Sequence, residues 1–164
     1  MAGATAVEEE RSRIAAAVYG TIVVLAAVSY VSEDDALDAG QVAIAMLGTA
    51  VVYFAAHVYV DYLAARMTGA SGGAAGVLRT VVVEEWPLLQ ATLAPGVPLV
   101  LGAAGVLSRS TSVNLALIVA LADLVGWGYA AGRRTYGHRM GAIGSALVAV
   151  LLGLIVVTLK QLLH

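Results

Sequence analysis

Five long stretches of hydrophobic residues follow one another along the chain, and short polar segments separate them. A helix needs about 20 residues to cross the hydrocarbon core of a bilayer, and each stretch is close to that length. Backbone groups in lipid must form their hydrogen bonds within their own segment, and the alternation typical of barrel strands is missing, so the stretches predict α-helices. The expected spans are residues 14–31, 41–65, 86–107, 113–132 and 140–159.

The composition places the whole chain in the same class. Of 164 residues, 60% are hydrophobic and 12% are charged, whereas soluble domains carry about 25% charged residues. We therefore predict an all-α, polytopic membrane protein: a cytoplasmic segment 1–13, then a single domain 14–164 with a bundle of about five transmembrane helices, solvated by the lipid bilayer. The net charge of −2 argues against a nucleic-acid partner, and the lack of cysteine excludes disulfides and thiolate metal sites.

The basic residues predict how the chain is oriented. Seven of the nine Lys and Arg residues fall in the N-terminal segment, in the linker 66–85, or between the fourth and fifth spans. Cytoplasmic loops carry such an excess of basic residues, so we expect a multi-pass protein of the cell membrane with its N-terminus inside and its C-terminus outside. The seven residues are Arg11, Arg13, Arg66, Arg79, Arg133, Arg134 and Arg139.

The third span contains the features that can interrupt a helix. Residues 68–76 have the composition of a flexible linker, and residues 78–85 are expected to form an interfacial helix that enters the span. Pro87 fits the first turn of the span, where a missing N–H costs little. Pro95 and Pro98 lie in mid-span, where they predict either a packing kink or a broken helix beside an ion path.

Polar side chains inside the second span are the first functional clue. An ionisable group at the centre of a membrane helix costs about 2.5–3.5 kcal/mol. Tyr53, His57 and Asp61 follow one another at intervals of four residues, so they share one helical face. His57 is expected about 12 Å from the cytoplasmic end of its span.

Further polar groups are expected at similar depth in the other spans. Asp123 lies about 14 Å from the cytoplasmic end of the fourth span. Gln90 lies in the third span, with Glu84 and Glu85 at its cytoplasmic mouth. These groups converge if the second, third and fourth spans are neighbours, which the sequence does not establish.

This set of side chains suggests cation chemistry. His57, Asp61, Glu84, Glu85 and Asp123 are candidate metal ligands, because imidazole and carboxylate bind Fe, Mn and Zn, and Tyr53 and Gln90 would line a polar pathway. The same groups can relay protons, or simply pair with one another and fix helix packing. No organic cofactor is indicated, and a divalent metal ion is the one bound species that the residues suggest. Nucleophile elbow, phosphate loop, dinucleotide fingerprint and HExxH motif are all missing, so no enzyme is expected.

Small residues predict close helix packing near the C-terminus. Gly128 and Gly132 form a GxxxG pattern, and Gly141 and Ser145 are spaced in the same way. Such pairs let helices approach each other within one chain or between chains.

The layout also resembles that of the vacuolar iron transporter family, which has five spans with the N-terminus inside. Residues 13–23 are similar to its first span, with an Arg and then Tyr-Gly-Thr-Ile-Val for Asp-Gly-Leu-Val. Residues 56–60 stand where that family has Gly-Glu-Tyr-Val-Ser, and residues 85–99 resemble its proline-rich third span. Gly153 and Thr158 resemble residues of its last span. The resemblance implies iron transport.

This chain departs from that family at the metal site itself. Tyr19 stands for the Asp of the first span, His57 for the Glu of the second, and Tyr53 for the preceding Met. The Glu-rich cytoplasmic domain is replaced by residues 68–85 alone.

Three functions are consistent with the sequence. The first is a small transporter or channel for a divalent metal or protons, expected as a homo-oligomer with a pathway at the subunit interface. The second is a non-transporting scaffold or accessory subunit whose buried polar groups are structural. The third is lipid binding or a membrane-embedded enzyme, with Arg133, Arg134, His138 and Arg139 at the inner interface.

Overall fold

The regular structure is entirely α-helical in the residues that the structure describes. It is a computed structural model that describes the backbone of residues 2–69 and 73–162, and the side chains of residues 12–69 and 73–155 and of Thr158. This confirms the predicted fold class. The helices are α1 (Ala2–Val31), α2 (Ala39–Met67), α3 (Ala74–Gln90), α4 (Leu93–Ala103), α5 (Arg109–Tyr136) and α6 (Arg139–Leu162).

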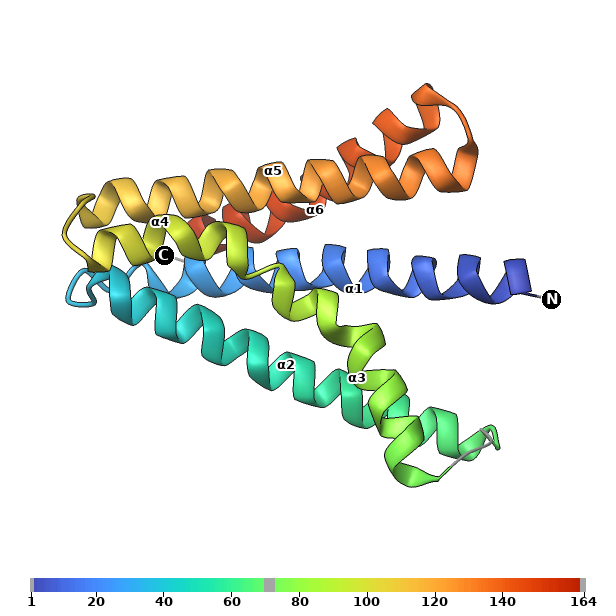
Figure 1. Ribbon diagram of the computed structural model, residues 1–164. Coiled ribbons are helices and arrows are strands. Elements are labelled where there is room, and N and C mark those ends of the chain that lie inside the picture. Colours follow the sequence, from blue (N-terminus) through green and yellow to red (C-terminus); the bar gives the residue numbers. More distant parts are fainter. Residues whose placement is uncertain (1, 70–72, 163–164) are drawn as a thin grey trace.

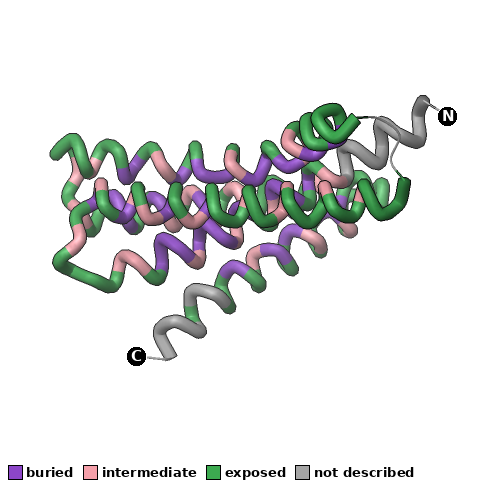
Figure 2. Tube along the Cα trace, turned by 90° about the horizontal axis from the view of Figure 1, so that it is seen from below, coloured by how far each residue is buried: buried purple, intermediate pink, exposed green. Residues whose placement is uncertain are grey.

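The helices run in alternating directions along one axis, with α3 and α4 together forming one leg (Figure 1). The central helix is α1, which packs against α2, α3, α5 and α6. In its apolar segment 61% of the residues are buried, compared with 22% in the apolar segment of α2 and 28% in that of α5. Buried positions accordingly lie on the inward faces, and exposed positions cover the outside (Figure 2).

In the described parts of the chain three helices are long and apolar enough to cross a membrane: α1 over Ser12–Val31, α2 and α5. The pair α3 and α4 makes a fourth candidate if the two helices form one bent span. Within the described residues the apolar part of α6, Arg139–Ile155, is shorter. The chain therefore has the helices of a membrane protein with three or four candidate spans, and the fifth span remains a prediction.

The bend of 50° between α3 and α4 has a clear cause in the sequence. The ring of a proline clashes with the carbonyl four residues earlier, which for Pro95 belongs to Ala91. The first helix ends at Gln90 and the next begins at Leu93, so the break lies where that clash would occur. The structure thus has a broken helix in the third leg.

The beginning of this leg differs from the prediction. Pro87 was expected in a first turn, but it lies well inside α3, which begins at Ala74. Residues 78–85 are helical and continue into this leg, as predicted, but the helix begins earlier than expected, and α2 continues to Met67, so the linker is short. The apolar positions Val77 and Val81 are buried, which explains why the helix extends this far.

Small residues bring the helices together as the GxxxG pattern predicted, here within one chain. A Cβ atom on Gly132 would lie 2.6 Å from the Cα of Ala142, and one on Gly128 would lie 2.9 Å from the Cβ of Ala149. These glycines allow α5 and α6 to approach closely.

Arg109 ties the first loop to the start of α5. Its guanidinium donates hydrogen bonds to the backbone carbonyls of Ser32 (2.9 Å), Asp34 (2.7 Å) and Leu37 (2.6 Å), and to the carboxylate of Asp35 (3.0 Å). The guanidinium has five donors in a planar fork, so a single side chain can satisfy several loop carbonyls.

The two ends of the bundle differ in charge. The end that holds the N-terminal part of α1 also holds the last turns of α2 and α5 and the first turns of α3 and α6 (Figure 1). Basic residues are concentrated there. The acidic loop between α1 and α2 lies at the opposite end, with Arg109 as its ion-pair partner.

Candidate functional site

The predicted polar face of α2 is present in the structure. His57 lies ten residues before the end of the helix at Met67, or about 15 Å along its axis. The His57 Nδ1 atom lies 3.1 Å from the backbone carbonyl oxygen of Tyr53. A carbonyl can only accept, so this contact requires a proton on Nδ1. In the neutral ring the Nε2 atom then carries the lone pair, which is the position through which an imidazole binds a metal.

A tyrosine from α1 completes the aromatic part of the site. The Tyr19 ring lies 4.9 Å from the His57 ring and 6.0 Å from the Tyr53 ring, measured between centroids. Gly20 follows it, and a Cβ there would lie 2.7 Å from the backbone oxygen of Leu88 in α3. The missing side chain at Gly20 therefore brings α1 against α3 and sets Tyr19 beside α2.

The acidic part of the site comes from α2 and α3. Glu85 is only 5% exposed, although it belongs to an apolar helix. Its carboxyl group lies near the carboxyl group of Asp61 and the imidazole of His57, so these ionisable groups interact electrostatically. Phe54 and Trp86 pack edge to face at 6.3 Å and hold the two helices together beside this contact.

The proximity of Asp61 and Glu85 has a chemical consequence. Two carboxylates at one site repel each other, and a cation bound beside them relieves that repulsion. With an imidazole close by, the two groups form a unit that can bind a positive charge. We call the set Tyr19, Tyr53, His57, Asp61 and Glu85 the His57 cluster.

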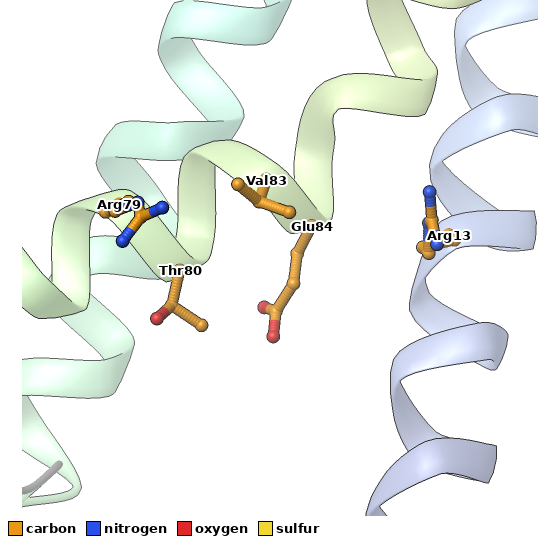
Figure 3. Close-up of a pocket in the computed structure, with 5 residues that line it drawn as sticks. All are labelled: Arg13, Arg79, Thr80, Val83 and Glu84. Carbon is orange, nitrogen blue, oxygen red and sulfur yellow. The ribbon is translucent and has the colours of Figure 1, made fainter.

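The remaining predicted residues do not all join this cluster. Glu84 is the neighbour of Glu85 but also lines a separate cleft between α1 and α3 (Figure 3). Gln90 is exposed at the end of α3. No group of three or more His, Cys, Asp or Glu side chains is arranged to hold a metal ion in the part of the chain that the structure describes.

Asp123 lies on a different side of the bundle from His57. It is half-buried near the middle of α5, a helix that packs mainly on α1, α4 and α6 and hardly touches α2. Among the described residues its carboxylate has no hydrogen-bond or ion-pair partner. The condition under which Asp123 and His57 would converge, that their two helices are neighbours, is therefore not fulfilled within this chain.

Tyr19 is the member of the cluster that the sequence analysis missed as a site residue. Tyrosines near helix ends are usually interfacial anchors, and nothing in the spacing of one helix shows what faces it from another. The only indication came from the resemblance to the vacuolar iron transporter family, in which the positions that correspond to Tyr19 and His57 are acidic.

No family model matches this chain, and no curated protein or solved structure matches it. The function is therefore inferred from the chemistry of the His57 cluster.

Proposed function

We propose that the chain crosses the cell membrane five times, with its N-terminus in the cytoplasm and its C-terminus outside. The concentration of basic residues at one end of the bundle supports this orientation. The 24 residues of α6 correspond to about 36 Å, which is long enough for a fifth span. Epitope tags at the two termini, probed in intact cells, test the proposal, and tags on the same side would contradict it.

Within this topology, we propose that the protein is a small transporter or channel for a cation, with the His57 cluster as its binding site. The observation that carries the proposal is Glu85, an ionisable side chain buried in an apolar helix against a second carboxyl group. Such a group is costly inside a membrane and usually marks an ion or proton pathway.

The cluster favours the proton over a divalent metal as the cation. Among the described residues no group of three or more His, Cys, Asp or Glu side chains is arranged to hold a metal ion, whereas carboxyl and imidazole groups in a membrane relay protons without such a ligand set. The iron transport implied by the family resemblance is therefore the variant of the proposal to test second.

Reconstitution into liposomes tests the transport function. A pH gradient across the membrane, followed with a trapped pH-sensitive dye, is expected to dissipate faster with the wild-type protein than in empty liposomes. Glu85→Gln removes the proton-binding carboxyl group at nearly constant volume, so its flux is expected to fall to the rate of empty liposomes. Glu84→Gln is the matched control, since it changes the neighbouring carboxyl group outside the cluster, and it is expected to retain flux.

The same preparations separate transport from the alternative of a scaffold or accessory subunit. In a scaffold, Glu85→Gln and His57→Ala would change the melting temperature in detergent, but no variant would change flux, because the wild type would carry none. A ligand that binds only the folded protein raises the melting temperature, so Fe²⁺, Mn²⁺ and Zn²⁺ are screened alongside pH. A specific shift by one metal that is lost in His57→Ala would favour metal transport.

We further propose that the protein acts as a homo-oligomer. The outward face of α2 carries large exposed side chains such as Ile44, Val52 and Val60, so this helix has little packing of its own. Single-molecule photobleaching in liposomes measures the number of copies, and a monomer that retains full flux would exclude a pathway between subunits.

A further inference from the structure

A second polar feature lies at the basic end of the bundle, apart from the His57 cluster. It is an open cleft of about 300 Å³ between α1 and α3, lined by Arg13, Arg79, Thr80, Val83 and Glu84 (Figure 3). We call it the Arg13–Arg79 cleft. It joins residues from helices that are far apart in sequence, so it exists only when α1 and α3 are packed together.

The two arginines are available for a ligand. Both side chains are exposed, and neither guanidinium has a hydrogen-bond or ion-pair partner within the described parts of the chain. Glu84 also lines the cleft but has an interaction of its own. Two guanidinium groups and one carboxylate leave the lining with a single net positive charge, which matches one phosphodiester. Guanidinium groups bind phosphate oxygens through paired N–H donors.

The position of the cleft indicates where such a phosphate would come from. Arg13 lies 18 residues before the end of α1 at Val31, or about 27 Å, close to the thickness of the hydrocarbon core. The cleft therefore lies at the level of the headgroups. Val83, which lines it, is 58% exposed, and Trp86 on the following turn is 50% exposed, so an apolar surface continues from the cleft towards the hydrocarbon.

We propose that the Arg13–Arg79 cleft binds the phosphodiester headgroup of an anionic phospholipid, whose acyl chain lies along the exposed side of α3. The proposal rests on the membrane placement given above but not on cation transport. Because the lipid would contact α1 and α3 together, it would also stabilise the packing that sets Tyr19 beside His57.

Thermal unfolding in a neutral detergent tests this site. Added phosphatidylglycerol is expected to raise the melting temperature of the wild type more than phosphatidylcholine or phosphatidylethanolamine. Each surface arginine contributes about 1 kcal/mol to the binding of an anionic lipid, so the double variant Arg13→Gln, Arg79→Gln is expected to bind about 30-fold more weakly and to lose the specific shift. Arg66→Gln is the matched control, because it removes an exposed arginine from the same end of the bundle but not from the cleft.

Each outcome decides the proposal. Retention of the full phosphatidylglycerol shift by the double variant would overturn it, and so would an equal loss in Arg66→Gln, which would indicate only diffuse surface charge. An equal response to phosphatidylethanolamine would show that a zwitterionic headgroup is bound instead. If the double variant fails to fold, the single variants Arg13→Lys and Arg79→Lys replace it. These variants keep the charge but lose the paired N–H donors of the guanidinium. Native mass spectrometry then counts the lipids that each variant binds. The flux of the double variant is measured separately, so failure of the lipid site and failure of the transport function are distinguishable.

Discussion

Replacement of Arg109 by Met tests how much this side chain stabilises the contact between the loop after α1 and the first turn of α5. The variant keeps the length of the side chain and removes all four hydrogen bonds of the guanidinium. A hydrogen bond contributes about 1 kcal/mol net, so the three bonds to loop carbonyls predict a loss of about 3 kcal/mol.

The ion pair with Asp35 is expected to contribute little of that loss. The Asp35 side chain is 96% exposed, and exposed ion pairs are worth about 0–1 kcal/mol because water and salt screen them. Asp35→Asn is therefore expected to change the free energy of unfolding by less than about 0.5 kcal/mol. Arg109→Lys keeps the charge but has no fork, so we expect it to lose more than half of the stabilisation.

Unfolding by denaturant in detergent micelles, followed by circular dichroism, gives the free energies for the three variants and the wild type. The reasoning predicts a large loss for Arg109→Met, an intermediate loss for Arg109→Lys and almost none for Asp35→Asn, with little dependence on salt. Equal losses in Arg109→Met and Asp35→Asn would show that the ion pair dominates. An Arg109→Lys variant as stable as the wild type would show that the geometry of the fork is irrelevant.

Other positions give shorter tests. Gly132→Ala is expected to cost about 1–3 kcal/mol in the same unfolding assay, because its Cβ would lie 2.6 Å from the Ala142 Cα. Gly126→Ala on the same helix meets nothing within 4 Å and is expected to be neutral or stabilising. Pro95→Ala is expected to reduce the 50° bend, measured between spin labels on α3 and α4. Asp123→Asn is expected not to lower the melting temperature, since no described partner is lost.

The hydrophobic pattern predicted the helices well because hydrocarbon imposes a length on them. The expected spans at residues 14–31, 41–65 and 113–132 lie within α1, α2 and α5, and differ from them mainly at the ends. Those ends depend on local hydrogen bonds that hydropathy does not measure. The start of α2, for example, is set by Asp38 and Gln41, which cap each other at 2.8 Å.

The third leg was harder to predict, because proline has opposite effects at different places in a helix. Pro87 is accommodated inside α3, whereas the helix breaks one turn before Pro95. The sequence alone left a kink and a break as alternatives. The buried face of α3 at Val81, Glu85 and Leu88 shows why the helix continues past the first proline: packing against α1 and α2 compensates for one missing hydrogen bond.

The candidate site shows which part of a side chain's position can be predicted from the sequence. The number of residues from the end of a span gives the depth of a side chain, and by that measure His57 and Asp123 belong together. The same count says nothing about which helices are neighbours or which way each one is rotated. In the structure α1 lies between them: Tyr19 faces His57, and α5 packs on another side of the same helix.

The chain consequently has two separate ionisable sites at comparable depth, with different chemistry. The His57 cluster supplies partners for its own groups, since Asp61 lies near Glu85 and the backbone carbonyl of Tyr53 contacts the imidazole. Asp123 has no such partner among the described residues, so removal of its charge is expected to affect neither the cluster nor the packing. Loss of flux in Asp123→Asn with an unchanged melting temperature would therefore mean that the pathway extends beyond the His57 cluster to the far side of α1. Retained flux in Asp123→Asn, together with loss of flux in Glu85→Gln, would confine the pathway to the face that α1, α2 and α3 form together.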